Sequence, residues 1–294
     1  MENAVEIRSR SEAESAAHRP DLLRSRASRT TKAARHHFSL EQQLAELRRE
    51  NDDLRRALFE AAQVQRRLCG PRLLKRHSFE IASEIFPVRH LSGDFISLFE
   101  VQDDLVFAVG DIAGKGLPAG MWFTHVISNI RLQFTMYRDP SVVLASVNRG
   151  LLHAQLELPL TSVFIARLNP RTGELTYCNA GHPPAIVIRD NGYQEKLTQG
   201  GPLLGVLPET SFVDGKTILG RGDTLLAYSD GIPECRNAAE LEFGEERLLG
   251  DAQLLCASSS ASMLFSILAN VEDFAGGRPR EDDIALLVLQ RNKQ

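Results

Sequence analysis

The hydrophobic positions of residues 39–68 recur at alternating steps of four and three residues. The first series is Leu40, Leu47, Leu54, Ala61 and Leu68, and the second is Leu44, Asn51, Leu58 and Gln65. No Gly or Pro interrupts the chain between Phe38 and Cys69. Such a pattern over about four heptads predicts one amphipathic helix with a coiled-coil seam.

Two arrangements of this helix stay open. A single amphipathic helix that lies on its own domain would show a partly similar pattern. The strict spacing, with Asn51 at an a-type position, favours a two-stranded coiled coil over 39–68 and hence a homodimer. Gly70-Pro71 ends the helix, so we expect a coiled-coil helical linker over 38–70.

From Phe79 onward, short apolar runs bounded by turn residues predict a strand-rich body. The expected strands are 79–86, 94–99, 105–111, 162–169, 174–179, 185–189, 194–197, 212–218, 224–229 and 284–290. The expected helices are 118–137, 142–156, 245–257 and 261–274. Because strands and helices do not alternate regularly, the pattern indicates an α+β fold rather than a doubly wound sheet.

Composition narrows the class of protein. With 43% hydrophobic residues the chain can bury a core, but its longest clean apolar run, Ile284 to Leu289, is too short to span a bilayer. The N-terminus has no apolar segment of a secretory signal. Residues 1–37 carry eight Lys/Arg against five Asp/Glu without an apolar period, so we expect a disordered polar tail there. The formal net charge of −4 then leaves an acidic body, which argues against nucleic acid as the main partner.

The cysteines indicate the cellular compartment. Cys69, Cys178, Cys235 and Cys256 lie far apart in the sequence and form no C-x-x-C pair. This spacing favours reduced thiols in the cytoplasm over disulfides or a zinc site. We therefore expect a cytoplasmic protein without a membrane span.

The stretch from Leu105 to Gly116 places one carboxylate, Asp111, at the end of an apolar run and inside a glycine-rich turn. A buried carboxylate is costly unless it is paired or bound to a metal ion. The alternative is an aspartate that caps the following helix. The stretch is not a P-loop, because only three residues separate Gly110 from Gly114 and Gly116 replaces the Ser or Thr that would hold magnesium.

Further acidic residues occur at the ends of predicted strands. Asp94 lies beside a strand, Asp230 follows one before a glycine, and Asp282 and Asp283 directly precede another. One Asp-Gly pair after a strand is most often a turn. Several carboxylates together suit magnesium or manganese, which prefer oxygen ligands. Two such ions would hold a water, lower its pKa and bind a phosphoryl group.

Seven short motifs follow one another in the order found in a known family. They are 92–95, 110–116, 179–184, 201–205, 222–234, 243–244 and 282–284. Over residues 79–290 this set resembles the PPM-type, metal-dependent protein phosphatases of the bacterial SpoIIE-like branch, close to its RsbU-like members. The resemblance implies an α-β-β-α sandwich of two antiparallel sheets over 71–294, preceded by the coiled-coil helix.

The resemblance also implies the metal ligands. Asp111 would bridge two Mn²⁺ or Mg²⁺ ions and hold the nucleophilic water, with the backbone carbonyl of Ile112 as a further ligand. Asp230 and Asp282 resemble ligands of the first ion. Asp94 would contact a metal directly or through a neighbouring ligand. In the family the ligand is the first residue of the pair that includes Asp283, which makes Asp283 the weaker candidate.

Three positions qualify this assignment. His182 is expected to shape a turn between strands, with a role as general acid as the alternative. The family often has a second carboxylate three residues after Asp94, whereas this chain has Ser97, so any metal or water contact of that residue is in question. Ala113 stands where the eukaryotic branch has a histidine, and the sequence names no general acid.

We therefore expect a phosphoserine/phosphothreonine protein phosphatase that uses in-line attack of metal-bound water without a phosphoenzyme. The resemblance implies a substrate such as a phosphorylated anti-sigma-factor antagonist of a partner-switching pathway, and an activating partner at residues 1–70. The alternative is a catalytically silent, phosphatase-like dimeric module that binds a phosphoprotein and signals through its coiled coil. A cyclase or nucleotidyl transferase would need a nucleotide-binding motif, which the sequence does not show.

Overall fold

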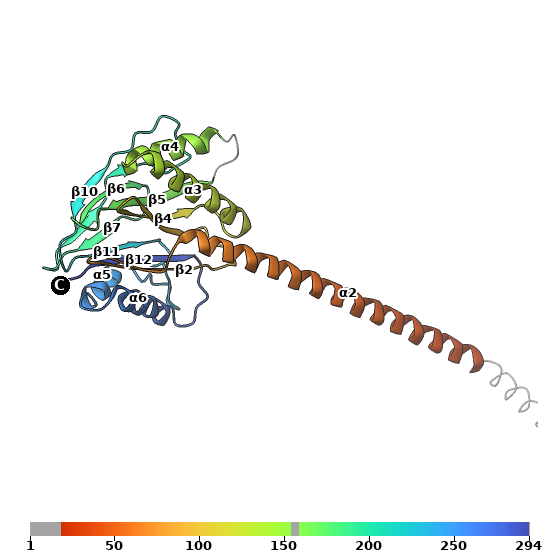
Figure 1. Cartoon of the computed structure of the whole chain (residues 1–294). Coiled ribbons are helices and arrows are strands. Elements are labelled where there is room, and N and C mark those ends of the chain that lie inside the picture. Colours follow the sequence, from red (N-terminus) through yellow and green to blue (C-terminus); the bar gives the residue numbers. More distant parts are fainter. Residues whose placement is uncertain (1–18, 154–158, 294) are drawn as a thin grey trace, which may run out of the picture. The chain divides into compact units, whose positions relative to one another are not determined.

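The computed structural model describes residues 19–153 and 159–293, with side chains from residue 40 onward. The chain divides into two compact units, Met1–Ala57 and Leu58–Gln294. Helix α2 (Arg19–Cys69) is the described part of the first unit, and its last turns belong to the second. All other described helices and strands lie in the second unit (Figure 1).

Helix α2 begins at Arg19, whereas the sequence predicts a disordered tail to residue 37. Residues 19–37 contain many Arg with Ala and Leu, no Gly, and one Pro at the second helical position. Arg, Ala and Leu are strong helix formers and Pro is tolerated in the first turn, which explains the longer helix. The rest of the predicted tail, 1–18, lies outside the described residues.

Twelve strands of the described residues form two sheets. The first sheet runs in the order β1 (Leu73–Arg76), β2 (Phe79–Phe86), β12 (Ile284–Arg291), β11 (Thr224–Tyr228), β7 (Ala185–Ile188) and β8 (Gln194–Leu197). The second runs in the order β10 (Gly215–Ile218), β6 (Glu174–Ala180), β5 (Thr161–Leu168), β4 (Asp104–Ile112) and β3 (Phe95–Val101), with β9 (Gly200–Gly201) beside β6. Every strand pair is antiparallel except β6 with β9.

Two helices cover the outer face of each sheet (Figure 1). Helices α3 (Leu117–Met136) and α4 (Pro140–His153) pack on the second sheet, and α5 (Glu245–Leu254) and α6 (Ser260–Ala275) pack on the first. The result is the expected α-β-β-α sandwich. Among the helices described, none has the length and apolar character needed to cross a membrane.

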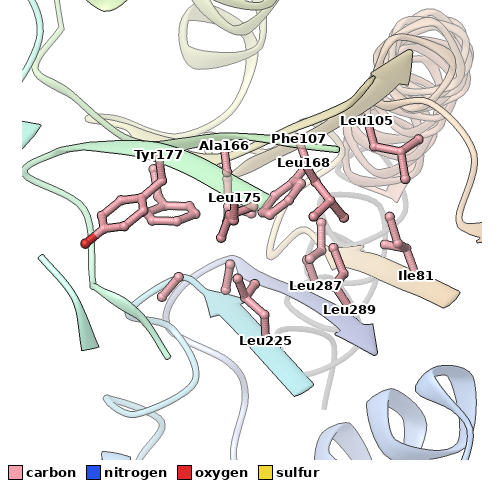
Figure 2. Close-up of a cluster of buried hydrophobic side chains, with 14 of the residues drawn as sticks. Ile81, Leu105, Phe107, Ala166, Leu168, Leu175, Tyr177, Leu225, Leu287 and Leu289 are labelled. Carbon is pink, nitrogen blue, oxygen red and sulfur yellow. The ribbon is translucent and has the colours of Figure 1, made fainter. Parts of the chain in front are cut away.

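The central core lies between the two sheets. Figure 2 shows Phe107 and Leu168 of the second sheet facing Leu225, Leu287 and Leu289 of the first. These side chains are almost completely shielded from solvent. Burying a side chain of this size stabilises the fold by about 1.5–3 kcal/mol.

Strand β4 is central to the second sheet, and its sequence reflects burial on both faces. Leu105, Phe107 and Val109 point into the core between the sheets. Val106 and Ala108 alternate with them and pack against the helices on the outer face. This explains the continuous apolar run that ends at the candidate site.

The ten predicted strands of the body and its four helices are all present, with most ends shifted by a few residues. The predicted end of the helix 142–156 lies outside the described residues. Strands β1 and β9 were not expected. Strand β1, Leu-Leu-Lys-Arg, is short and lies at a sheet edge. Its sequence does not alternate between apolar and polar residues, so the pattern gave no sign of a strand. Strand β9 consists of two glycines, and a Cβ on Gly200 would lie 1.8 Å from the Asn179 carbonyl oxygen. Glycine is therefore needed there for close approach of the backbones.

Replacing Leu287 with Ala tests the core between the sheets. Leu287 has no exposed surface and lies on central strand β12, so Leu287→Ala should lower the free energy of unfolding by about 2–5 kcal/mol. Urea unfolding measures this change. The matched control is Leu132→Ala on α3, where the side chain is 55% exposed and the change should stay within about 0.5 kcal/mol. Equal losses in the two variants would contradict the assigned core.

Candidate active site

Strand ends from both sheets bring acidic residues to one end of the sandwich. In the second sheet, Asp94 directly precedes β3 and Asp111 is the second-last residue of β4. The pairing of Phe95 with Gly110 places these two aspartates at the same end of adjacent strands. In the first sheet, Asp230 follows β11 and Asp282 precedes β12, its antiparallel neighbour. The site predicted from the sequence is thus assembled from the two sheets.

Burial, and after it repulsion by neighbouring carboxylates, raises the pKa of Asp94, Asp111 and Asp230. Burial is the main cause of the raised pKa of Asp111, about 6, and repulsion by Asp230 and Asp282 adds to it. The pKa of Asp230 is raised by burial and then by Asp282. Burial also raises the pKa of Asp94 well above its usual range, with Asp111 among the charges that add to the shift. A site that concentrates negative charge in this way is suited to a cation.

Asp94 has the most enclosed of these side chains. It is 3% exposed, and its Oδ2 has no hydrogen-bond partner among the described residues. Ser229 acts against the shift by a hydrogen bond that lowers the pKa of Asp94. A buried carboxylate oxygen without a partner is costly, and a metal ion or an ordered water bound to one would remove that cost.

Gly93 brings the backbone of the Asp94 segment against β4. A Cβ on Gly93 would lie 2.7 Å from the Ile112 carbonyl oxygen and 3.2 Å from Oδ1 of Asp111. Glycine is therefore required where these two oxygens approach the chain. Both are ligands expected from the sequence, and the structure places them side by side around Gly93.

Asp283 has a different environment from the other aspartates. Its Oδ1 accepts a hydrogen bond from the Val88 backbone N–H at 2.6 Å. Its Oδ2 accepts bonds from the Ser92 hydroxyl at 2.9 Å and the Gly93 N–H at 2.8 Å. Asp283 therefore connects the first sheet to the loop that carries Asp94, and its oxygens are occupied by protein donors.

Asp282 lies at the exposed edge of the group. Its Oδ1 forms an ion pair with the Lys115 ammonium at 2.9 Å and accepts the backbone N–H of Asp283 at the same distance. Lys115 also donates to the Glu281 carbonyl oxygen at 2.5 Å. Sequence reasoning did not assign Lys115, although it lies in the same glycine-rich turn as Asp111.

The donor set fits a hard divalent cation, because it consists of carboxylate and carbonyl oxygens. Within residues 40–153 and 159–293, no three His, Cys, Asp or Glu side chains already converge to hold an ion. The unpartnered Asp94 oxygen and the two oxygens around Gly93 are acceptors that such a cation could use.

His182 is held by several hydrogen bonds near the candidate carboxylates. Its Nδ1 lies 2.8 Å from the hydroxyl of Ser162, which is opposite Asp111 in the β4–β5 pair. Its backbone N–H donates to the Asn179 side chain at 2.8 Å, and that side chain donates back to the His182 carbonyl at 2.9 Å. These bonds fit the expected role in shaping the turn. Burial lowers the pKa of His182 to about 3, so the ring is neutral near pH 7 and has no proton of an imidazolium to donate.

Ser97 is buried on β3 and accepts a hydrogen bond from Nε of Arg131 at 3.3 Å. Arg131, on α3, also donates to the carbonyl oxygen of Leu68 at the end of α2, at 2.8 Å. Ser97, which departs from the family pattern, is thus linked through Arg131 to the end of α2.

The alternative role of Asp111, as a cap of the following helix, is not observed. The N-cap of α3 is Gly116, and no side chain forms a hydrogen bond there.

The end of α2 contacts the loop before Asp94. The amide of Gln65 donates to the Ser92 carbonyl oxygen at 2.8 Å and accepts the Ser92 N–H at 3.2 Å. Ala62 and Gln65 are buried, and Leu68 packs against the α3–α4 side of the fold. The last turns of the heptad pattern therefore pack on the body, which is the alternative arrangement that the sequence left open. The heptad pattern alone gave no signal that Gln65 binds backbone groups.

The fold is that of PP2C-type phosphatase domains. The SiaA-PP2C domain of Pseudomonas aeruginosa has the same fold, with a TM-score of 0.69 at 18% identity, covering 82% of this chain and 98% of that domain. The RsbU and RsbW domains of a Mycobacterium tuberculosis protein give a TM-score of 0.62 at 25% identity, covering 73% of this chain and 60% of that chain.

Residues 102–292 match the SpoIIE family (stage II sporulation protein E), and the chain belongs to this family. The phosphoserine phosphatase RsbU of Bacillus subtilis is 26% identical over 237 residues, which cover 79% of this chain and 69% of RsbU. The expected SpoIIE-like class and its enzyme activity, a protein serine/threonine phosphatase, are thereby confirmed.

The neutral, buried His182 predicts how stability depends on pH. Its pKa is lower in the folded chain, about 3, than in the unfolded chain, where a free histidine titrates near 6.5. Between these values the unfolded chain binds more protons, so this residue makes the protein less stable as the pH falls from about 6.5 to 3. Thermal unfolding of wild type and His182→Ala across this range measures the contribution.

His182→Ala should have a lower melting temperature at pH 7, because the bond to Ser162 is lost, and a weaker decline toward acid pH. Residual activity of the folded variant should stay within about tenfold of wild type. His153→Ala is the control, since His153 is exposed at the end of α4. A loss of several thousandfold in activity with unchanged melting would instead identify His182 as a catalytic acid or base.

Proposed function

We propose that this phosphatase hydrolyses phosphoserine or phosphothreonine with two Mn²⁺ or Mg²⁺ ions bound at the carboxylate group. Asp111 would bridge the ions, with the Ile112 carbonyl, Asp230, Asp282 and Asp94 as further ligands. The observation that carries this proposal is the gathering of mutually repelling carboxylates at one end of the sandwich. The buried Asp94 oxygen without a partner supports it.

The residues of the chain have separate roles in this mechanism. Two bound cations would lower the pKa of a water and neutralise phosphoryl oxygens. Asp111, on strand β4, would help to hold the attacking water beside the phosphoryl group. Asp283 holds the loop that positions Asp94, and Gly93 leaves room for the oxygens of Asp111 and Ile112. In the reaction, water adds to phosphorus, the bond from phosphorus to the serine or threonine oxygen breaks, and one proton of the water ends on that oxygen, which gives inorganic phosphate and the free hydroxyl.

The proposed substrate is a phosphorylated regulatory protein, such as an anti-sigma-factor antagonist, in the cytoplasm. The similarity to the phosphoserine phosphatase RsbU and to a structure with RsbU and RsbW domains supports a partner-switching pathway. Four free cysteines, one of them fully buried, support a reducing compartment. We further propose that a partner protein activates the phosphatase by binding at residues 1–70.

Substitution of Asp111 tests the metal centre. Asp111→Asn removes the charge shared by two cations and should lower phosphate release from a phosphoserine peptide by about 100-fold or more. The variant should fold, because the substitution relieves repulsion by Asp230 and Asp282. Asp230→Asn and Asp282→Asn should behave similarly, and Asp94→Asn should keep weak activity at high manganese.

The matched control is Asp103→Asn, at the exposed turn between β3 and β4 at the other end of β4. Activity is measured with manganese and with a chelator. Full activity of folded Asp111→Asn, or of wild type in chelator, would exclude the proposed centre. Phosphopeptide binding without turnover in wild type with manganese would support the catalytically silent module instead.

We also propose a homodimer through the first part of α2. Leu40, Leu44, Leu47 and Leu54 are between 48% and 66% exposed, although they follow the heptad pattern. A second copy of the same helix is the occupant that this spacing fits, and an Asn51 pair would fix its register. The bonds from Gln65 to Ser92 support a dependence of activity on this helix, since the Ser92 hydroxyl is bonded to Asp283.

Charges placed on the seam test the dimer. Leu47→Glu with Leu54→Glu would bring like charges together in two core layers, so the double variant should be monomeric. Gln42→Glu with Ala45→Glu adds the same charges off the seam and should remain dimeric. Light scattering measures mass, and phosphate release measures activity. A wild-type protein that is monomeric at tens of micromolar would exclude the proposed dimer. Unchanged activity of the monomeric double variant would show that α2 serves only as a spacer.

A further inference from the structure

His182 lies where the chain passes from one sheet to the other, in the turn between β6 and β7. The bonds with Asn179 hold the backbone of this turn and do not involve the ring. The ring is nevertheless buried, and a buried polar group is costly unless its neighbours form hydrogen bonds with it. The groups around its two nitrogens therefore indicate what the imidazole does.

The neighbour of the ring on the second sheet is Ser162, whose hydroxyl lies 2.8 Å from Nδ1. Ser162 is directly opposite Asp111 in the β4–β5 pair. Phe164 and Val109, two positions away on the same strands, face the core between the sheets. Because side chains alternate along a strand, Ser162 and Asp111 face the same space. The ring is therefore bonded to the position that pairs with the proposed bridging ligand.

The neighbour of the ring on the first sheet is the backbone of Tyr228. Burial lowers the pKa of His182, and the carbonyl of Tyr228 acts in the opposite direction. A carbonyl raises the pKa of an imidazole when it faces a ring N–H. With Nδ1 at Ser162, the carbonyl faces Nε2, which has no hydrogen bond of standard geometry within the described residues. The ring proton therefore belongs on Nε2, and Nδ1 accepts the O–H of Ser162.

The carbonyl of Tyr228 cannot obtain its donor from the neighbouring strand. Ser229 donates its N–H to the Ala285 carbonyl of β12 at 3.0 Å. Backbone groups alternate in direction along an antiparallel strand, so those of Tyr228 point away from β12, toward the side of β7. The β11–β7 register, continued by two positions, places Pro184 opposite Tyr228, and proline has no N–H. The N–H that faces this carbonyl is the one on the His182 ring.

The ring thus connects the two sheets beside two proposed metal ligands. On the second sheet it is bonded opposite Asp111, and on the first it faces Tyr228, two residues before Asp230. Repulsion between these two aspartates favours separation of the strand ends, and the ring opposes it. We propose that His182 is a positioning residue that sets the separation of Asp111 and Asp230 and thereby the affinity for cations, an inference that rests on the proposed metal centre.

Manganese binding, measured separately from turnover, tests this role. Calorimetry with metal-free protein gives the affinity, and His182→Ala should bind manganese about tenfold more weakly or worse, as expected when a residue behind the ligands is lost. The kcat on a phosphoserine peptide at saturating manganese should stay within about tenfold of wild type. Electron paramagnetic resonance reports the magnetic coupling of two bound Mn²⁺ ions, which should weaken in this variant.

Three further variants separate positioning from general stability. His182→Gln should recover much of the manganese affinity, because its amide offers an acceptor and an N–H donor. Ser162→Ala should weaken binding, and the double variant with His182→Ala should bind no more weakly than His182→Ala alone, because the two residues act through one bond. Ile81→Val is the matched control. Ile81 is buried and pairs with Leu289, near the end of β12 away from Asp282, so this variant should melt earlier with unchanged manganese affinity.

Unchanged manganese affinity in folded His182→Ala and Ser162→Ala would overturn the proposal. Equal losses of affinity in His182→Ala and Ile81→Val would overturn it too, because they would reflect stability alone. Failure of the proposed hydrolysis gives a different result: wild type binds manganese but releases no phosphate, and the binding data still decide the role of His182. A wild-type protein that binds no manganese would exclude both the metal centre and this role.

Discussion

Repulsion between carboxylates is the constraint on which this structure depends. Asp94, Asp111 and Asp230 lie near one another, and the pKa of each is raised, first by burial and then by repulsion between the carboxylates, which burial strengthens. An isolated loop would relax and separate such groups. Here they are attached to the ends of strands whose other residues fill the core between two sheets. The free energy gained in that core keeps the acidic residues together despite their repulsion.

The sequence predicted most of this arrangement because its signals are local. The apolar run of β4 and the glycines beside Asp111 are readable without a structure. The same is true of Asp230 after an apolar strand and of Asp94 at the start of one. The order of motifs then identified the family. What could not be predicted is pairing between distant segments. Nothing near Lys115 in the sequence indicates its partner Asp282, and the bonds that occupy Asp283 come from a loop about 190 residues earlier.

Helix α2 shows the same limit in another form. Its heptad pattern is continuous in sequence, but its residues have two environments. Leu47 and Leu54 are exposed, whereas Ala62 and Gln65 are buried against the body. A hydrophobic stripe shows that a helix face is covered without showing what covers it. The sequence predicted a disordered tail up to residue 37, whereas α2 begins at Arg19. A composition rich in Arg with Ala is compatible with both disorder and helix.

The bonds of Asp283 affect how variants of this site are interpreted. An acidic residue next to a proposed ligand, whose replacement inactivates an enzyme, is usually counted as another ligand. Here both oxygens of Asp283 are bonded to Val88, Ser92 and Gly93. Its removal would loosen the segment before Asp94 and so weaken metal binding indirectly. Inactivity of such a variant would therefore measure the order of a loop rather than the number of ligands.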